Sequence, residues 1–475
     1  MLEAVTNIPY PHWLNPGDNT WQLVSATLVG LMSLPGIAVL YGGLMQRKWV
    51  VNTMLMAFSG FSLVVLVWVL WGYNMAFGPT LFHTGPQVTT GHSTDLSFWG
   101  NFIGHPMPIV THFGEQNQAV SGANTLIPFH YPTATLAYFQ LVFAAITPLL
   151  FLGSLLGRFK FKAWLLFVPL WITFVYTVNA TLLWGGGFLA QKGAVDYSGG
   201  YVIHLAAGVT GFIGAAIVGP RLARDKNHAL PSNLMMVAVG SGILWLGWNG
   251  FNGGDPFYAG VSAAGAVLNT NIATAAALMT WVAMDMIFTK EHKPTFLGAI
   301  NGMIVGLVCI TPGAGWMDGY GALICGVFCC VVVWVAWNYL SKVKPFSHVD
   351  DALGVVYTHG IAGLLGGLMV GLLADPGMIE YGVAGKTYDA AGAFSVGGWF
   401  YTGSFHQLWE QFLAASWIII YTGIASAILF YIVKFICRGL REKDEVLEVG
   451  DLAVHDEEAY PRETFAERVT SLSRG

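Results

Sequence analysis

The sequence predicts an all-α integral membrane protein, and its composition is the first reason. Of the 475 residues, 55% are hydrophobic and only 10% are charged, whereas a soluble domain carries about 25% charged residues. Glycine occurs 59 times, a frequency typical of membrane helices that pack very closely. This composition excludes a soluble enzyme, a nucleic-acid-binding protein and a disordered chain.

The second reason is a series of eleven apolar stretches, each long enough to cross about 30 Å of hydrocarbon as a helix. In chain order they cover residues 21–44, 50–77, 131–156, 163–189, 199–219, 234–251, 261–288, 296–310, 321–340, 353–373 and 408–436. We expect an extracytoplasmic segment at 1–20, a membrane domain at 21–436 and a cytoplasmic regulatory tail at 437–475. Residues 79–130 form a long extracytoplasmic loop inside the membrane domain.

The third reason is the distribution of basic residues, which also predicts the orientation. All but two of the 21 Lys and Arg residues fall on one side of the eleven spans, and the exceptions are Lys192 and Lys386. Because basic loops stay in the cytoplasm, the N-terminus is expected outside and the C-terminus inside. The N-terminus lacks the basic start and apolar run of a secretory signal peptide. We therefore expect a multi-pass protein of the plasma or inner membrane.

No metal site or cofactor is predicted. The outer loop holds His83, His92, His105, His112 and His130, but no two of them have the i, i+4 spacing of a helical metal site. A polar loop packed over the outer face is the simpler interpretation. The five cysteines lie in apolar stretches and lack the spacing of a zinc site or a disulfide framework.

Two histidines, His204 and His359, fall deep inside predicted spans, the fifth and the tenth. Each begins the same pattern, H-x3-G-x2-G, which places glycines on the histidine's face of the helix and lets two helices approach closely. Repetition after five spans predicts two inverted five-helix repeats plus a peripheral eleventh helix, with a substrate site near the midplane. Buried histidines bonded to backbone are the alternative, but polar groups within a membrane are usually functional. Facing imidazoles would bind a small neutral polar solute or relay protons.

Two further residues lie at the outer ends of neighbouring spans. Trp184 ends the fourth span and Asp196 precedes the fifth. An indole face beside a carboxylate can bind a cation, because the ring quadrupole attracts positive charge. Both residues also have a structural interpretation, since Trp marks membrane interfaces and Asp caps helix N-termini.

Residues 196–221 resemble the signature of the ammonium transporter family (Amt/Mep/Rh); they read DYSGGYVIHLAAGVTGFIGAAIVGPR. The resemblance extends to PGIAVLYGGL in the first span, LLWGGGFLA before the signature, GWNGFNGG in the sixth span and VYTHGIAG in the tenth. It covers nearly the whole chain. The tryptophan at Trp184 favours the Amt branch over the Rh branch.

The resemblance implies a homotrimer in the lipid bilayer with one pore in each subunit. It assigns ammonium recruitment to Trp184 and Phe139, and it assigns a gate of two stacked rings to Phe143 and Phe251. His204 and His359 would line the pore, and Asp196 would serve recruitment or architecture. The tail resembles family tails that govern the docking of PII-type regulatory proteins.

Three features depart from the family pattern. Asp255 stands where many members have a vestibule serine, and it would either strengthen cation recruitment or cap the seventh helix. Gly354 stands where an aspartate often begins the tenth span, although Asp350 and Asp351 remain nearby. The loop at 79–130 is longer than usual.

We therefore expect a transporter, not an enzyme, that selects NH4+ outside, removes its proton and conducts NH3 inward, with or without the proton. One alternative is a passive Rh-type gas channel, and another is an ammonium sensor acting through a PII-type partner. A proton-coupled carrier for another solute, such as an amino acid, would need a roomier polar site.

Overall fold

The structure is a computed structural model of the chain. It describes residues 11, 13–79, 81, 98–110, 129–227, 229–378, 380–381 and 393–460. The predicted histidines His83, His92 and His112, Lys386 and the end of the tail lie outside the described residues.

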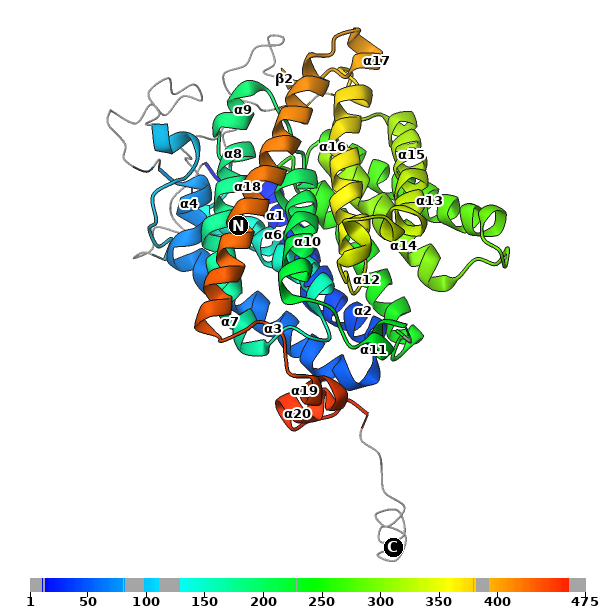
Figure 1. Cartoon of the computed structure of the whole chain (residues 1–475). Coiled ribbons are helices and arrows are strands. Elements are labelled where there is room, and N and C mark those ends of the chain that lie inside the picture. Colours follow the sequence, from blue (N-terminus) through cyan, green and yellow to red (C-terminus); the bar gives the residue numbers. More distant parts are fainter. Residues whose placement is uncertain are drawn as a thin grey trace, which may run out of the picture.

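Among the residues that the structure describes, eleven helical segments are long and apolar enough to cross a membrane, which confirms the number of spans predicted from the sequence. They cover Pro16–Leu44, Arg47–Phe77, Thr133–Leu155, Phe161–Lys192, Gly200–Val218, Leu234–Gly253, Val261–Phe288, Phe296–Gly313, Gly319–Lys342, Val356–Leu373 and His406–Ile436. Figure 1 shows them as one bundle. The bundle is the all-helical fold expected.

Several spans combine two or three helices. The α-helices of the spans are α1 (Pro16–Leu31), α2 (Ile37–Leu44), α3 (Val50–Val67), α4 (Tyr73–Phe77), α6 (Thr133–Leu155), α7 (Phe161–Trp171), α8 (Thr177–Leu183), α9 (Phe188–Lys192), α10 (Ala206–Val218), α12 (Leu234–Gly253), α13 (Val261–Phe288), α14 (Phe296–Ile310), α15 (Gly319–Asn338), α16 (Ala362–Leu373) and α18 (His406–Ile436). Outside the spans lie α11 (Ala223–Asn227), α17 (Trp399–Thr402), α19 (Asp444–Val449) and α20 (Asp451–His455). Two short antiparallel strands, β1 (Glu380–Tyr381) and β2 (Ala393–Phe394), pair Glu380 with Phe394.

Within the described ranges, five turns of π-helix interrupt the spans, at Met32–Gly36, Trp68–Gly72, Ile172–Tyr176, Gly200–Leu205 and Val356–Ile361. Short 3₁₀ turns lie at Arg47–Trp49, Phe98–Asn101, Thr311–Gly313, Leu340–Lys342 and Phe346–His348. Pro35 lies inside the first π turn and Pro169 shortly before the third. Proline has no N–H to donate, so it disturbs the regular ladder at these two points.

The helix ends follow their capping residues. The Asn15 side chain accepts from the backbone of Gly17 and Asp18, so α1 begins at Pro16, five residues before the span predicted from hydrophobicity. The side chains of Asn233 and Asp318 cap α12 and α15 in the same way. Such caps satisfy backbone donors that a helix leaves open at its start.

Helix α6 lies at the centre of the bundle, and nearly all its residues are buried. It packs against α1, α3 and α10. By contrast, α13 and α18 expose many large apolar side chains, among them Leu268 and Ile420. Such an exterior suits contact with lipid or with other membrane helices. We call the end of the bundle with α11, α19 and α20 the tail side, and the opposite end the loop side (Figure 1).

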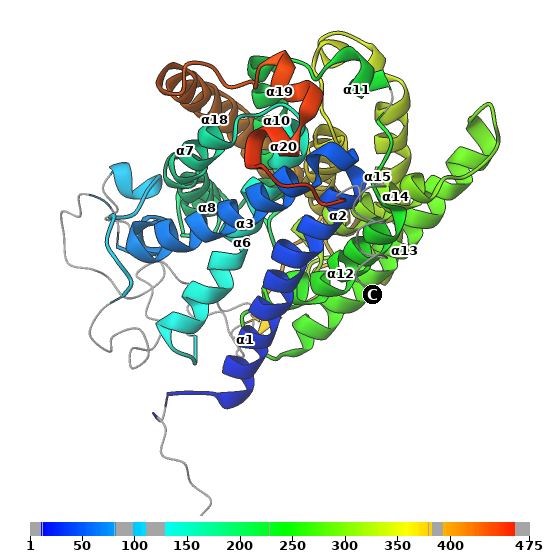
Figure 2. The same ribbon diagram turned by 90° about the horizontal axis from the view of Figure 1, so that it is seen from below.

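The tail helices α19 and α20 are fixed to the tail side of the bundle (Figure 2). The Asp451 carboxylate accepts from the backbone N–H of Val51 at 2.8 Å and of Asn52 at 2.9 Å, and so caps α3. The Lys48 ammonium donates to the carbonyl of Leu447 at 2.8 Å and pairs with Asp225 at 2.9 Å. The first part of the tail therefore packs as an ordered part of the fold.

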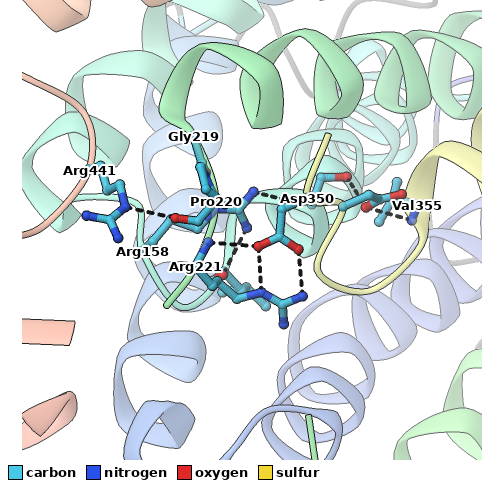
Figure 3. A network of polar contacts seen from close by, with 10 residues as sticks. Arg158, Gly219, Pro220, Arg221, Asp350, Val355 and Arg441 are labelled. Carbon is cyan, nitrogen blue, oxygen red and sulfur yellow. Dashed lines mark hydrogen bonds and ion pairs between the residues drawn. The ribbon is translucent and has the colours of Figure 1, made fainter. Parts of the chain in front are cut away.

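A buried arginine network joins the tail-side loops (Figure 3). The fully buried Arg158 guanidinium donates to the carbonyls of Gly219 and Asp350. Arg221 donates to both oxygens of the Asp350 carboxylate, at 3.0 and 2.8 Å. Burial favours the neutral form of Asp350, but the two arginines outweigh it and lower its pKa to about 2. Arg441 extends the network into the tail by donating to the Pro220 carbonyl at 2.8 Å.

Candidate functional site

The structure brings the two predicted histidines together at the centre of the bundle. His204 lies on the π turn Gly200–Leu205 and His359 on the π turn Val356–Ile361. Their ring centroids are 5.6 Å apart, with an angle of 53° between the rings. Both side chains are buried. Because each histidine lies on a π turn at the start of its span, the fifth and the tenth, the two rings come from equivalent positions in the two halves of the chain.

Glycines permit this approach of the two helices. A Cβ atom on Gly208 would lie 2.2 Å from the Cα of Gly360, and one on Gly363 would lie 3.0 Å from the Cβ of His204. Residue numbers rise along one helix as they fall along the other at these contacts. The two spans therefore cross in opposite directions, as inverted repeats require.

His204 is a buried polar group without a partner. Neither Nδ1 nor Nε2 of its ring has a hydrogen-bond partner among the described residues. The ring stacks on Trp248 at 5.3 Å and faces Phe251 at 5.9 Å between centroids. Buried polar atoms are normally paired, because burying one without a hydrogen bond costs free energy. An unpaired imidazole in an aromatic setting therefore points to a polar species that binds there.

His359 has one fixed nitrogen. The Thr358 hydroxyl donates to the Gly354 carbonyl at 3.1 Å and lies 2.9 Å from His359 Nδ1. Because that hydroxyl has a single hydrogen, its oxygen accepts from Nδ1–H in this arrangement, and we assign Nε2 as the unprotonated nitrogen. Nε2 is then available as an acceptor.

A continuous line of aromatic rings joins the loop side to the histidines. The centroids of Phe139 and Phe143 are 4.8 Å apart, and those of Phe143 and Phe251 are 4.4 Å apart. Phe251 then contacts His204. All three phenylalanines are buried. The line therefore consists of apolar rings in contact with one another up to the first imidazole.

Trp184 lies at the loop-side end of this line. Its indole N–H donates to the Asp196 carbonyl at 2.7 Å. Its ring meets Phe143 edge to face, with centroids 6.3 Å apart and an angle of 89°. The hydrogen bond to the backbone fixes the ring, and the side chain remains partly exposed.

Asp196 is a cap for the fifth span. Its carboxylate accepts from the backbone N–H groups of Gly199, Gly200, Tyr201 and Val202 at 2.6–3.1 Å. Burial raises the pKa of this carboxyl above its ordinary value, and the four N–H bonds counteract that rise. The carboxylate is directed at the helix start.

Asp351 plays the same part in the tenth span. Its carboxylate accepts from the N–H groups of Val355 and Val356 at 3.1 and 2.8 Å and from the Ser154 hydroxyl at 2.8 Å. Asp196 stands eight residues before His204, and Asp351 stands eight residues before His359. Sequence reasoning missed this repeated D-x7-H spacing, which was the available signal.

Although Gly354 has no carboxylate, the start of the tenth span is still capped by one. The carboxylate at the start of the tenth span is present, three residues earlier, as Asp351. Gly354 itself has a φ of +74°, and a Cβ there would lie 2.0 Å from the Trp337 ring. No side chain fits at this position without displacing the indole.

Asp255 does not cap the seventh span. The N-cap of α13 is Gly260, which makes no side-chain capping bond. The Asp255 carboxylate is buried and instead hydrogen-bonds the Ser198 hydroxyl, which also contacts the Phe251 carbonyl at 2.8 Å. The neighbouring Gly254 packs against Phe139, since a Cβ there would lie 2.4 Å from that ring. Asp255 thus places a carboxylate beside the loop-side end of the aromatic line.

On the tail side, the line of rings ends in a cavity of about 260 Å³. Its lining includes His359, Thr358, Asp351, Asp225 and Arg221. Sequence reasoning missed this cavity and the role of Thr358, because the lining residues come from segments far apart in the chain. The cavity connects the second imidazole to the loops that hold the tail.

A buried line of aromatic rings leads through two imidazoles to a largely apolar cavity that also contains charged side chains. Within eleven membrane-length helices of the described residues, this arrangement defines a multi-span membrane transporter or channel. The sequence profile of the Ammonium Transporter Family matches residues 20–460. The chain belongs to the ammonium transporter family.

Two plant proteins and one solved structure illustrate the relationship. Ammonium transporter 3 member 2 of Oryza sativa subsp. japonica is 45% identical over 457 residues, covering 96% of this chain and 92% of that protein. Ammonium transporter 2 of Arabidopsis thaliana is 43% identical over 451 residues, covering 95% and 89%. The crystal structure of Saccharomyces cerevisiae Mep2 is 26% identical, with a TM-score of 0.75, covering 91% of this chain and 89% of that one.

Proposed function

We propose that this protein carries ammonium nitrogen across the plasma or inner membrane, from the loop side to a cytoplasmic tail side. This proposal is supported chiefly by the His204 ring, which has no hydrogen-bond partner among the described residues and lies at the end of the line of aromatic rings. A bare cation loses its hydration at high cost in such a file, whereas neutral ammonia crosses with hydrogen bonds to imidazole. The excess of Lys and Arg beside the tail supports the orientation.

Recruitment of NH4+ is proposed at Trp184, Phe139 and Asp255. The indole ring is held by its bond to the Asp196 carbonyl, so its face is positioned before a cation arrives. Cation–π attraction acts within about 6 Å of such a ring. The buried Asp255 carboxylate adds negative charge beside the same entrance.

Loss of the proton is proposed at or below the gate formed by Phe143 and Phe251. The ring centroids stand only 4.4 Å apart, so the rings must move aside for the substrate to pass. Beyond them, NH3 donates to the accepting Nε2 of His359 and exchanges hydrogen bonds with His204. The hydrogen bond between Thr358 and His359 Nδ1 supports this step, because it leaves Nε2 as the accepting nitrogen.

We infer that Asp196 acts through architecture. All four of its capping bonds go to backbone N–H groups, which fix the start of the span that carries His204. Asp351 supports His359 in the same manner. Removal of either carboxylate would displace an imidazole without removing a substrate contact.

We also propose two interactions of the whole protein, a homotrimer and a regulatory partner, from its membership of the family. Three copies are expected to form a homotrimer in the bilayer with one file of rings in each. The tail is also expected to receive a PII-type regulatory protein. The tail contacts the cavity wall through Lys48, which donates to the Leu447 carbonyl and pairs with Asp225 in that wall. Light scattering of the detergent-solubilised protein, corrected for detergent, should give three times the chain mass of 51.3 kDa.

The decisive experiment compares this proposal with the passive Rh-type alternative. Proteoliposomes are given an ammonium gradient under an inside-negative and an inside-positive potassium diffusion potential, with uptake followed by 15N content. Co-transfer of the proton makes uptake faster when the inside is negative. Equal rates under both potentials support an electroneutral NH3 channel. A chain that moves no ammonium under either potential but binds a PII-type partner in an ammonium-dependent way would favour the sensor.

A further inference from the structure

Three cysteine side chains converge between α14 and α15. Cys309 lies at the end of α14, and Cys325 and Cys329 lie one turn apart on α15. All three are fully buried, and their sulfur atoms lie within 4.8 Å of one another. The sulfurs of Cys325 and Cys329 are 3.9 Å apart. The spacing of the cysteines in the sequence did not predict this cluster, which tertiary packing creates.

The geometry fits one metal ion among three sulfurs. A metal–sulfur bond is about 2.3 Å long, so three sulfurs around one ion in a plane are roughly 4.0 Å apart. The 3.9 Å separation of Cys325 and Cys329 is close to that value. The third sulfur, of Cys309, lies within the same 4.8 Å limit.

The number of ligands selects the class of ion. Zinc in a structural site takes four ligands, and among the described residues this group contains three. Soft sulfur ligands favour soft ions such as Cu+, which accept two or three sulfurs. We propose that Cys309, Cys325 and Cys329 form a binding site for a soft monovalent cation of the Cu+ and Ag+ class.

The charge balance suits the surroundings. As one sulfur binds the cation, its S–H bond breaks and the proton leaves for solvent, while the other two sulfurs bind as neutral thiols. No electron is transferred. One thiolate and one monovalent cation make a neutral assembly, which an apolar interior accommodates at lower cost than a net charge. The ion enters during local opening of the helix pair, because all three thiols are closed to solvent.

The chain supplies its own matched control. Cys330 adjoins Cys329 on α15 and is equally buried. Its thiol donates to the Ala277 carbonyl on α13 at 3.0 Å, so it points away from the cluster. Cys437 is partly exposed at the end of α18, and it must be removed because an accessible thiol binds silver by itself.

The experiment measures silver bound to the purified full-length protein. Cys437→Ser protein in chloride-free detergent buffer is incubated with silver nitrate, desalted and analysed for silver per chain by mass spectrometry. We expect about one tightly held ion per chain, as three converged thiols provide one site. Adding Cys325→Ser, which leaves two of the three sulfurs, should lower the retained silver well below one ion per chain, whereas adding Cys330→Ser should leave it unchanged. Zinc sulfate in place of silver should leave no retained ion.

Two results would overturn the proposal: no retained silver in the Cys437→Ser protein, or equal loss of silver with Cys330→Ser and Cys325→Ser. The melting temperature without metal shows whether each variant is folded. If Cys325→Ser does not fold, X-ray absorption at the silver edge on the Cys437→Ser protein replaces it. Two or three sulfur neighbours support the site, and a single sulfur neighbour contradicts it.

Discussion

His204 places two ring nitrogens, which have no hydrogen-bond partner in the described part of the chain, beside the buried line of aromatic rings. Replacing it with alanine removes the hydrogen bonds offered to ammonia, each worth on the order of 1–3 kcal/mol at a buried site. We therefore expect His204→Ala to lower the rate of 15N-ammonium uptake about tenfold. His406→Ala is the control, because that side chain is exposed on the loop side, and it should keep the wild-type rate. Equal rates in all three proteins would remove His204 from the path.

Trp184 permits a test of recruitment separate from conduction. Trp184→Leu removes the aromatic face, and a cation–π contact is worth about 1–2 kcal/mol. The ammonium concentration for half-maximal uptake should rise roughly tenfold, with a smaller rise for Trp184→Phe. Trp409→Leu, at an exposed position on α18, serves as the control. A change in maximal rate alone, with the half-maximal concentration fixed, would contradict a recruiting role.

At the scale of helices, the crossing of α10 with the π turn of His359 depends on glycine. A Cβ on Gly208 would lie 2.2 Å from the Gly360 backbone, so Gly208→Ala must push the helices apart, at a cost of about 1–3 kcal/mol. Gly242→Ala on α12 is the control variant, since a Cβ at Gly242 would meet no described atom within 4 Å. The melting temperature should fall for Gly208→Ala and stay or rise for Gly242→Ala. A stable Gly208→Ala protein with normal uptake would show that the crossing is less tight than described.

The tail-side loops should respond to acid through Asp350. Its folded pKa of about 2 lies below the ordinary 3.8, so its charged form adds stability of about 2 kcal/mol. That contribution is complete above the ordinary pKa and is lost as pH falls through about 2. Asp350→Asn should therefore melt at a lower temperature than wild type at neutral pH. The difference between the two melting temperatures should become smaller below pH 3.8. A difference in melting temperature that does not change with pH would mean that the ion pair of Asp350 with Arg221 adds no stability.

Hydrophobic length predicted the eleven spans, but the interruptions needed the folded backbone. Residues such as Pro35 mark one π turn, whereas the turns that carry His204 and His359 contain no proline. The start of α1 moved because Asn15 caps it. A capping residue such as Asn15 shifts the boundary of a span by several residues without changing the number of spans.

For the whole molecule, the paired histidines were predictable because their pattern repeats along the chain. The capping role of Asp351 was not predicted, because it depends on which backbone N–H groups the carboxylate faces after the tenth span folds. The convergence of Cys309, Cys325 and Cys329 depends on two helices meeting, and no spacing within the chain encodes it. The Asp255 carboxylate likewise hydrogen-bonds Ser198 and does not cap α13, and this tertiary contact could not be predicted from the local sequence.

The line of contacting rings should admit ammonium nitrogen and reject bare cations. The most direct measurement follows 15N-ammonium and rubidium uptake, rubidium standing for potassium, into the same proteoliposomes at acidic pH, with empty liposomes alongside. We predict ammonium uptake well above that of empty liposomes and rubidium uptake equal to theirs. Comparable uptake of rubidium and ammonium would contradict the claim, because a wide hydrated channel would then replace the closed file of rings.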